Sequence, residues 1–441
     1  MKMLPEKISH AQTELFQSRL STQLNPQHPL LQLAKVIPWS FLEESFGSHF
    51  KEGPGQPPKP IRLMVGLLML QHMEGLSDVQ VVYKWVENPY WQAFCGYDFL
   101  QWELPVNHSS MTRWRKRLGE EGMEKILSST IQTAVETQVV NPKDLERVIA
   151  DTTVMEKNIC YPTDGALLNK IRERLVSLAK KQGLSLRQSY ARVGQHLVRK
   201  ISGYAHAKQF KRLSHGVKKL KTYLGRVIRD IERKISPTPD RMEFFTELLT
   251  IGKQLLKQSK HSKNKVYSVH EPQVYCIAKG KARTAYEFGC KVGLVLTHKQ
   301  GLVLSSKAWE SCVYDGHTLQ ANLDQAEKLS GHSIKRAFVD RGYKGHGVQG
   351  CEVYISGQRR GLTKSLKKQL KRRSAIEPHI GHMKAEGKLR RNALKGHLGD
   401  KINALLCAVG HNLRLILNYF RLLLAFFLGL IFQVRALSLA V

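Results

Sequence analysis

Three carboxylates in this chain stand in settings that suit metal-dependent phosphate chemistry. Asp340 follows a short apolar run, residues 337–339, and a basic turn begins directly after it at Arg341. A buried strand that ends on a carboxylate is how open α/β folds present catalytic groups. Asp151 stands within a second run of strand character, residues 147–154. Because Asp is disfavoured in strands, its presence there predicts a bulge or an edge position.

The third carboxylate, Glu377, follows a basic stretch that contains no acid. This stretch comprises Arg359, Arg360, Lys364, Lys367, Lys368, Lys371, Arg372 and Arg373. On a helix, Arg373, Glu377 and Lys384 fall within a narrow arc of one face. Neighbouring cations favour the ionised acid, as a metal ligand requires. A structural alternative fits the same residues, since Ser374 and Glu377 can form a capping box with Pro378 in the first turn. The candidate DNA contacts of this region are Arg341, Arg359, Arg360, Arg373 and Lys384.

One acid from each of two strands and one from a following helix can meet at one edge of a mixed sheet. Carboxylates and waters hold Mg²⁺ or Mn²⁺, and two such ions about 3.5–4 Å apart stabilise both the attacking and the leaving oxygen in phosphodiester chemistry. Such a site could cut a strand and join it elsewhere. Other acids fit less well, because Glu386 lacks an Arg four residues before it and Glu156 is a lesser candidate beside Asp151. Scattered histidines are more often hydrogen-bonding groups than ligands, which applies to His270, His317 and His346.

The charge of the chain predicts a polyanionic partner. Its 441 residues include 69 Lys and Arg against 36 Asp and Glu, for a formal net charge of +33 and a pI of about 9.9. Each phosphate that a cation neutralises releases counterions, which favours binding. An anionic membrane surface is the competing partner, but the cations are spread over several hundred residues rather than gathered beside one apolar segment. Double-stranded DNA is therefore the expected partner.

Cysteine usage and the two ends of the chain predict a cytoplasmic protein. The seven cysteines are odd in number, scattered and never in a Cys-x-x-Cys pair, which suits a reducing compartment. The first residues lack the apolar region of a signal peptide. Residues 422–432 are uninterrupted apolar sequence, but the run is shorter than the roughly 20 residues that a membrane span needs. We expect a buried C-terminal helix.

Composition and periodicity divide the chain into four parts. Residues 1–55 form an N-terminal segment that ends in a Gly/Pro-rich linker. Residues 56–140 are expected to be all-α and helix-turn-helix-like, with a basic helix that carries the candidate DNA contacts Arg113, Arg115, Lys116 and Arg117. The alternative is a helical bundle whose basic residues are only solvated. Residues 141–400 read as an α/β catalytic domain with a mixed sheet, and residues 401–441 as an apolar helix.

A basic helical insertion at about residues 164–265 interrupts the predicted α/β domain. Residues 161–270 contain 25 Lys and Arg against 7 Asp and Glu, so 25 minus 7 gives a local net charge of +18. An ordinary solvated helical arm carries interspersed charges of both signs. This imbalance predicts an insertion that faces DNA.

Several ordered segments carry a resemblance to a known family. They are residues 151–158, 161–164, 270–272, 279–281, 286–289, 314–317, 339–343, 356–360 and 372–378. With these segments, from about Pro57 to the C-terminus, the chain resembles bacterial DDE transposases of the insertion sequence 5 group, which have a ribonuclease H-like catalytic domain. The resemblance implies that Asp151, Asp340 and Glu377 bind Mg²⁺ or Mn²⁺, as two ions.

The resemblance also implies a reaction and partners. Such enzymes bind the terminal inverted repeats of an insertion sequence, cleave the DNA ends and transfer them to target DNA, at least as a dimer. The family signature of Tyr, Arg, Glu and Lys maps onto Arg373, Glu377 and Lys384, but Leu370 stands at the tyrosine position. Cys312 and Val313 stand where the family more often has Asn-Pro. The alternatives are a metal-dependent DNA nuclease without strand transfer, or an inactive DNA-binding relic of a transposase.

Overall fold

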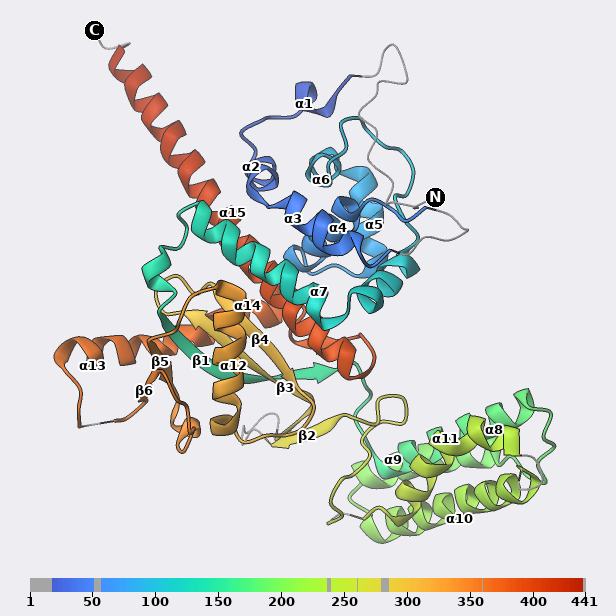
Figure 1. The fold of residues 1–441 in the computed structure, drawn as a ribbon. Coiled ribbons are helices and arrows are strands. Elements are labelled where there is room, and N and C mark those ends of the chain that lie inside the picture. Colours follow the sequence, from blue (N-terminus) through green and yellow to red (C-terminus); the bar gives the residue numbers. More distant parts are fainter. Residues whose placement is uncertain are drawn as a thin grey trace. The chain divides into compact units, whose positions relative to one another are not determined.

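The structure is a computed structural model that describes residues 18–50, 57–235, 239–259, 261–278, 285–358 and 360–438. The chain forms two compact units, residues 1–156 with 290–441, and residues 157–289. The first unit contains the N-terminal helices, most of the sheet and the C-terminal helix, and the second is mainly helical (Figure 1). Most of the expected linker and the motif at residues 279–281 lie outside the described residues.

A mixed sheet of seven strands organises the chain. Along the sheet the order is β2-β3-β1-β5-β6, with β4 paired to β3 and β7 paired to β1. β5 is parallel to both β1 and β6, whereas β3 is antiparallel to both β2 and β4. The strands are β1 (Arg147–Lys157), β2 (Tyr275–Ala278), β3 (Tyr286–Thr297), β4 (Val303–Trp309), β5 (Arg336–Val339), β6 (Glu352–Ile355) and β7 (Arg391–Asn392). The expected α/β class with a mixed sheet is therefore confirmed.

The strand that carries Asp151 is an internal strand, so the expected edge position is wrong. β1 lies between β3 and β5 in the sheet. Its apolar residues Val148, Ile149 and Ala150 are buried, and they offer no side-chain polar group to Asp151. Asp151 is tolerated in a central strand because the pairing of β1 with β5 is registered only from Arg147 to Ile149. On the β5 side, therefore, Asp151 stands two residues beyond the last paired residue of β1.

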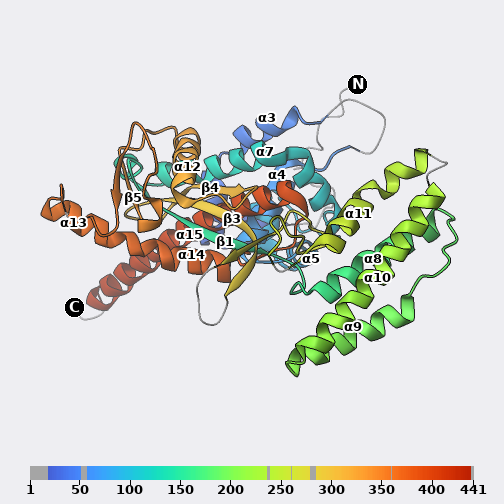
Figure 2. The ribbon, with the colours of Figure 1, turned by 90° about the horizontal axis from the view of Figure 1, so that it is seen from below.

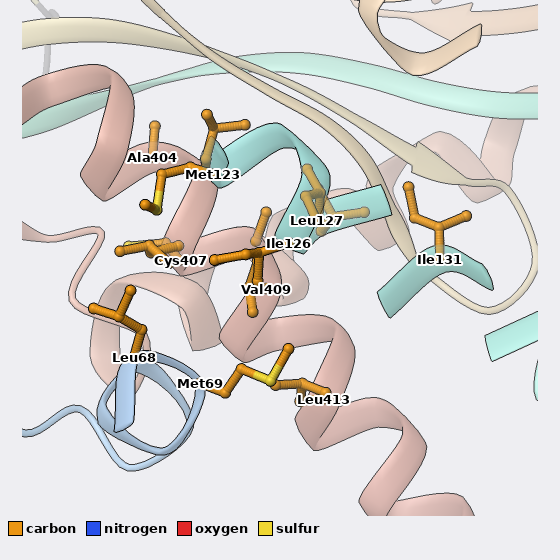
Figure 3. Packing of buried hydrophobic residues seen from close by; sticks show 14 of the residues in the cluster. Leu68, Met69, Met123, Ile126, Leu127, Ile131, Ala404, Cys407, Val409 and Leu413 are labelled. Atoms are coloured by element: carbon orange, nitrogen blue, oxygen red, sulfur yellow. The ribbon is translucent and has the colours of Figure 1, made fainter. Parts of the chain in front are cut away.

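Three helices form the centre of the first unit. α4 (Ile61–Met73), α7 (His108–Glu136) and α15 (Gly396–Ser438) bury apolar faces against one another. Figure 3 shows side chains of this core from all three helices, namely Leu68, Met69, Met123, Ile126, Leu127, Ile131, Ala404, Cys407, Val409 and Leu413. α4 is buried almost all round, as expected for a helix enclosed by others. α7 contains a break at Gly119, whose φ of +65° suits glycine. The remaining N-terminal helices are α1 (Leu20–Gln23), α2 (Pro29–Val36), α3 (Trp39–Gly47), α5 (Asp78–Glu87) and α6 (Pro89–Phe94).

The sheet, the N-terminal helices and the start of α15 share one hydrophobic core. This core therefore includes residues on both sides of positions 140 and 400. α15 is buried up to Leu417, as expected, but beyond it Leu422 is 70% exposed. Among the residues described, no helix combines the length and apolar character that crossing a bilayer requires.

In the part of the second unit that the structure describes, four helices share a core of their own. They are α8 (Asp164–Lys181), α9 (Ala191–His206), α10 (Phe210–Ile235) and α11 (Pro239–Lys257), shown side by side in Figure 2. Ile171, Leu175, Leu224, Ile228 and Phe245 are among the side chains buried between them. These helices correspond to the expected helical insertion at about residues 164–265.

Candidate active site

Asp151 and Asp340 lie on neighbouring parallel strands. The last residue pair in the parallel pairing of β1 with β5 is Ile149 with Phe338. Asp151 and Asp340 each stand two residues further along, since 151 minus 149 and 340 minus 338 both equal two. Asp340 directly follows β5, whose last residue is Val339, and precedes the short helix η2 (Arg341–Tyr343). The two carboxylates therefore emerge at the same level of the sheet.

Glu377 approaches this point from a helix. It lies in the first turn of α14 (Ile376–Ala385), which follows α13 (Lys364–Lys371) through the short helix η3 (Arg372–Ala375). No side chain caps α14, and the hydroxyl of Ser374 donates to the carbonyl of Lys371 at 3.2 Å. The capping box that would have explained Ser374 and Glu377 structurally is therefore absent.

Hydrogen bonds hold this helical segment against the turn between β3 and β4. Arg372 donates to the carbonyl oxygens of His298 and Lys299 at 3.0 and 2.7 Å. The ring nitrogen Nε2 of His298 lies 2.8 Å from the carbonyl oxygen of Gln369, and its ring packs on Phe338 of β5. The segment that carries Arg373 and Glu377 is thus fixed relative to the strands that carry the two aspartates.

The guanidinium of Arg373 contacts all three predicted carboxylates. Its nitrogens lie 3.7 Å from Asp151 Oδ2, 3.9 Å from Asp340 Oδ1 and 3.7 Å from Glu377 Oε1. The arginine side chain is only 13% exposed, whereas Asp340 and Glu377 are half or more exposed. Residues that are far apart in the sequence therefore converge on one cation, as the expected meeting of two strands and a helix requires.

Burial perturbs the titration of Asp151. It raises the pKa of Asp151 to about 6, and the negative charges of Asp340 and Asp315 act in the same direction. The backbone N–H of Thr152, which donates to Asp151 Oδ1 at 2.7 Å, and the charge of Arg373 oppose this increase. A second cation beside Asp151 would favour its ionised form further.

A fourth acid, Asp315, belongs to the surroundings of this site. It begins α12 (Asp315–Ser330), and its Oδ1 accepts hydrogen bonds from the Thr152 hydroxyl at 2.7 Å and the Lys291 ammonium at 2.8 Å. A Cβ on Gly342, two residues after Asp340, would lie 3.3 Å from Asp315 Oδ2. Asp315 therefore links the segments that follow both aspartates. Sequence reasoning placed it only within a family motif, because the link to Lys291 spans 24 residues and the link to Thr152 spans 163.

The three carboxylates fit a divalent cation by their chemistry. They offer only oxygen donors, which Mg²⁺ and Mn²⁺ prefer, and all of them already lie within 4 Å of one cationic group. Among the described residues, no group of three or more His, Cys, Asp or Glu side chains is close enough to hold a metal as it stands. Arg373 contacts the acids that a metal would need, so ion binding requires that its contacts loosen.

The other candidate ligands have separate partners. Glu386 contacts Arg414 of α15 at 3.6 Å and His382 at 3.2 Å. Hydrogen-bonding or packing roles also account for the three histidines considered as ligands: His270 bonds Ser268, His317 packs on Tyr314, and His346 accepts from the backbone of Val348. The backbone N–H of Glu156 donates to the carbonyl oxygen of Arg390 where β1 nears its end.

Comparison with known proteins gives a family and a broad function. Residues 18–117 match the family model described as "Transposase domain (DUF772)". A curated protein of Rhizobium meliloti, "Uncharacterized protein ORF8 in nfe locus", is 46% identical over 208 residues, which cover 47% of this chain and 100% of the relative. The chain belongs to the family of this protein. The transposase domain indicates a transposase-related function. No solved structure matches the chain.

The basic helix at the end of the matched domain exposes some of its basic side chains to solvent and buries one of them in the core. Arg113, Lys116 and Arg117 of α7 are exposed, with Arg117 stacked over Phe50 at 5.1 Å. Arg115 is only 3% exposed, and its guanidinium forms a two-nitrogen contact with the carboxylate of Asp78. This corrects the expectation that Arg115 contacts DNA. Helical periodicity turns one residue in this run toward the core, and its distant partners Asp78 and Gln71 make that position suitable for an arginine.

The remaining candidate DNA contacts of the sequence lie in the segments that follow Asp340 and Glu377. Arg341 and Arg360 are exposed, and Arg341 lies against Gly357, whose φ is +84°. Lys384 lies half-buried on α14, the helix of Glu377, and Arg359 lies outside the described residues. Leu370, which stands where the family signature has a tyrosine, lines an open cavity of about 330 Å³ beside α13.

Proposed function

We propose that this protein is a DDE transposase of the insertion sequence 5 group that binds the terminal inverted repeats of its element, cleaves the DNA ends and transfers them to target DNA. The observation that carries the proposal is the convergence of Asp151, Asp340 and Glu377 on Arg373. The match of residues 18–117 to a transposase domain supports the same function.

The sheet supports the proposed ribonuclease H-like character of the catalytic domain. Its central strand β1 has a parallel neighbour, β5, and a second parallel strand, β6, follows it, while β3 and β4 form an antiparallel hairpin. Two acids on neighbouring parallel strands and a third on a later helix are the arrangement that the proposed chemistry needs.

In the proposed site, Asp151, Asp340 and Glu377 would hold Mg²⁺ or Mn²⁺, as two ions. Bound there, the ions would lower the pKa of a water or a DNA 3′-hydroxyl and stabilise the departing oxygen. Arg373 reduces the mutual repulsion of the three carboxylates and keeps them together before an ion binds. Asp315 and Thr152 fix the strand beside Asp151.

The basic surface beside the site would position the DNA. The helix α13 has no buried residue and exposes Lys364, Lys367, Lys368 and Lys371 within eight residues. Together with Arg341 and Arg360 these side chains can neutralise phosphates on both sides of the scissile bond. Two DNA ends must be held at once, so the proposal includes at least a dimer.

A cleavage and strand-transfer assay tests the proposal. Duplexes that carry the element's own ends and scrambled duplexes are incubated with Mg²⁺ and either the unmodified protein or the Asp340→Ala variant. We expect joining that needs both the element's ends and Mg²⁺ and that disappears in the variant. Cutting of both duplexes without joining would identify a nuclease instead. Binding without any metal-dependent chemistry would identify a DNA-binding relic.

A further inference from the structure

We propose that the pair of helices α9 and α10 forms a second, metal-independent binding surface for the backbone of double-stranded DNA. We call residues 187–229, which include α9 and most of α10, the basic hairpin. It contains 12 Lys and Arg and 3 His without a single Asp or Glu. It belongs to the second unit, whereas the three carboxylates belong to the first.

Packing forces these cations to the surface. The apolar side chains Ile201, Leu220, Leu224 and Val227 of the two helices enter the core of the second unit. Because a helix that buries one face exposes the other, its charged residues are directed outward. The cations that are exposed comprise Arg187, Arg192, Arg199, Lys200, Lys208, Lys211, Arg212, Lys218, Lys219, Arg226 and Arg229.

The charge of the basic hairpin is not neutralised within the protein. Among the described residues, none of its 12 Lys and Arg forms an ion pair with an acid, and Glu173, Asp230 and Glu232 of the second unit pair with cations outside the basic hairpin. Asp230 contacts Arg233 and Lys234 at 2.9 and 3.1 Å, and Glu232 contacts Lys253 at 2.6 Å. The hairpin cations therefore retain mobile counterions, whose exchange for phosphates favours DNA binding.

Size and surface character favour a DNA duplex over a membrane. α10 has 26 residues and is about 39 Å long at 1.5 Å per residue, close to the roughly 34 Å of one DNA turn. A helix that binds a bilayer surface needs a continuous apolar face turned outward. On the basic hairpin, Val193 and Phe210 are the exposed large apolar side chains, and they belong to different helices.

The inference rests on the proposed function for the choice of DNA as the polyanion, but it uses none of the catalytic residues. Binding by the basic hairpin should persist without divalent metal, since Lys and Arg contact phosphates directly. It should also be independent of base sequence, because backbone contacts carry no sequence information.

The test compares two variants of the full chain with equal loss of charge. The first carries Arg199→Gln, Lys200→Gln, Lys218→Gln and Lys219→Gln on the basic hairpin. The matched control carries Lys170→Gln, Lys180→Gln, Lys181→Gln and Lys257→Gln on α8 and α11, where all four side chains are also exposed. The Kd for a duplex of about 30 base pairs is measured in EDTA between roughly 50 and 200 mM salt. A charge-conserving variant, Lys218→Arg with Lys219→Arg, shows that substitution itself does no harm.

We expect the hairpin variant to bind DNA at least about tenfold more weakly and to reduce the slope of log K against log salt by up to about 3.6, at about 0.9 per lost phosphate contact. The control and the charge-conserving variant should bind within about twofold of the unmodified protein. Unchanged binding by the hairpin variant, or an equal loss in the control, would overturn the proposal. The proposal would also be overturned if the hairpin variant lost binding to phosphatidylserine vesicles but still bound DNA normally, because that result would identify a membrane partner. An active-site variant such as Asp340→Ala should bind normally in EDTA, so failure of catalysis and failure of the hairpin remain distinguishable.

Discussion

Asp151 and Asp340 lie level with each other on two neighbouring parallel strands, each two residues beyond the pairing of Ile149 with Phe338. Parallel pairing alone would bring together two acids that repel each other. The guanidinium of Arg373, 3.7 Å from Asp151 and 3.9 Å from Asp340, compensates that repulsion. Three predictions concern this group of charges and its neighbour Asp315, and a fourth concerns Arg115 and Lys116 of α7.

The Arg373→Ala variant should be less stable than the unmodified protein in metal-free buffer. Three carboxylates would lose their common cation, and because two of them are well exposed we expect a loss of about 1 kcal/mol. Added Mg²⁺ should raise the thermal midpoint more in the variant than in the unmodified protein, since the ion would replace the lost charge. Arg360→Ala, which removes an exposed arginine, is the control. Equal midpoints of Arg373→Ala and the unmodified protein without metal would contradict this account.

The Asp151→Asn variant should become more stable than the unmodified protein as the pH rises. The folded-state pKa of Asp151 is about 6, above the ordinary value of 3.8, so the native state binds the proton more tightly than the unfolded state. The contribution of Asp151 to the free energy of unfolding is therefore fully present below about pH 4. It is lost as the pH rises from about 4 to 6, by an amount on the order of 2–3 kcal/mol. Asn cannot ionise and avoids this loss. Urea denaturation at pH 4 and pH 7.5 checks the sign, and a variant that is equally destabilised at both pH values would refute it.

Loss of Asp315 should reduce cleavage without reducing DNA binding. Asp315→Ala would leave the Lys291 ammonium and the Thr152 hydroxyl without their acceptor. We expect a fall in cleavage rate of tenfold or more together with a higher Mg²⁺ requirement, because misplacement of a catalytic group by about 1 Å is that costly. Asp315→Asn, which keeps an acceptor oxygen, should recover part of the rate.

Asp324→Ala serves as the control for Asp315, since Asp324 lies on the same helix and is exposed. Cleavage rates are measured over a range of Mg²⁺ concentrations. If Asp315→Ala behaved like Asp324→Ala, the link through Thr152 would have no part in positioning Asp151.

Arg115 and Lys116 should give opposite results when each is replaced by Ala. Arg115→Ala leaves the half-buried carboxylate of Asp78 without its two-nitrogen partner, and breaking such a pair costs about 3–5 kcal/mol. Lys116 is exposed, so Lys116→Ala should leave the melting temperature unchanged and weaken DNA binding only. Calorimetry and a DNA-binding titration on both variants separate the two effects. A Lys116→Ala variant with normal affinity would remove Lys116 from the DNA-binding surface.

The sequence by itself determined which local segments form strands and helices and which carboxylates are the candidate site residues. The apolar runs around residues 148 and 338 predict buried strands because most of their residues are β-branched or aromatic. The position of Glu377 four residues after Arg373 predicts their contact, which the structure shows at 3.7 Å. All of these inferences depend on neighbours within a few residues.

Only the tertiary structure decided which of these residues meet. That β1 is internal follows from its pairing with β3 and β5, which no local pattern specifies. The burial of Arg115 depends on Asp78, which lies 37 residues away, and the role of Asp315 depends on Thr152, which lies 163 residues away. Such contacts are fixed when distant segments pack to remove apolar surface from water, so they depend on the whole fold and not on local preference.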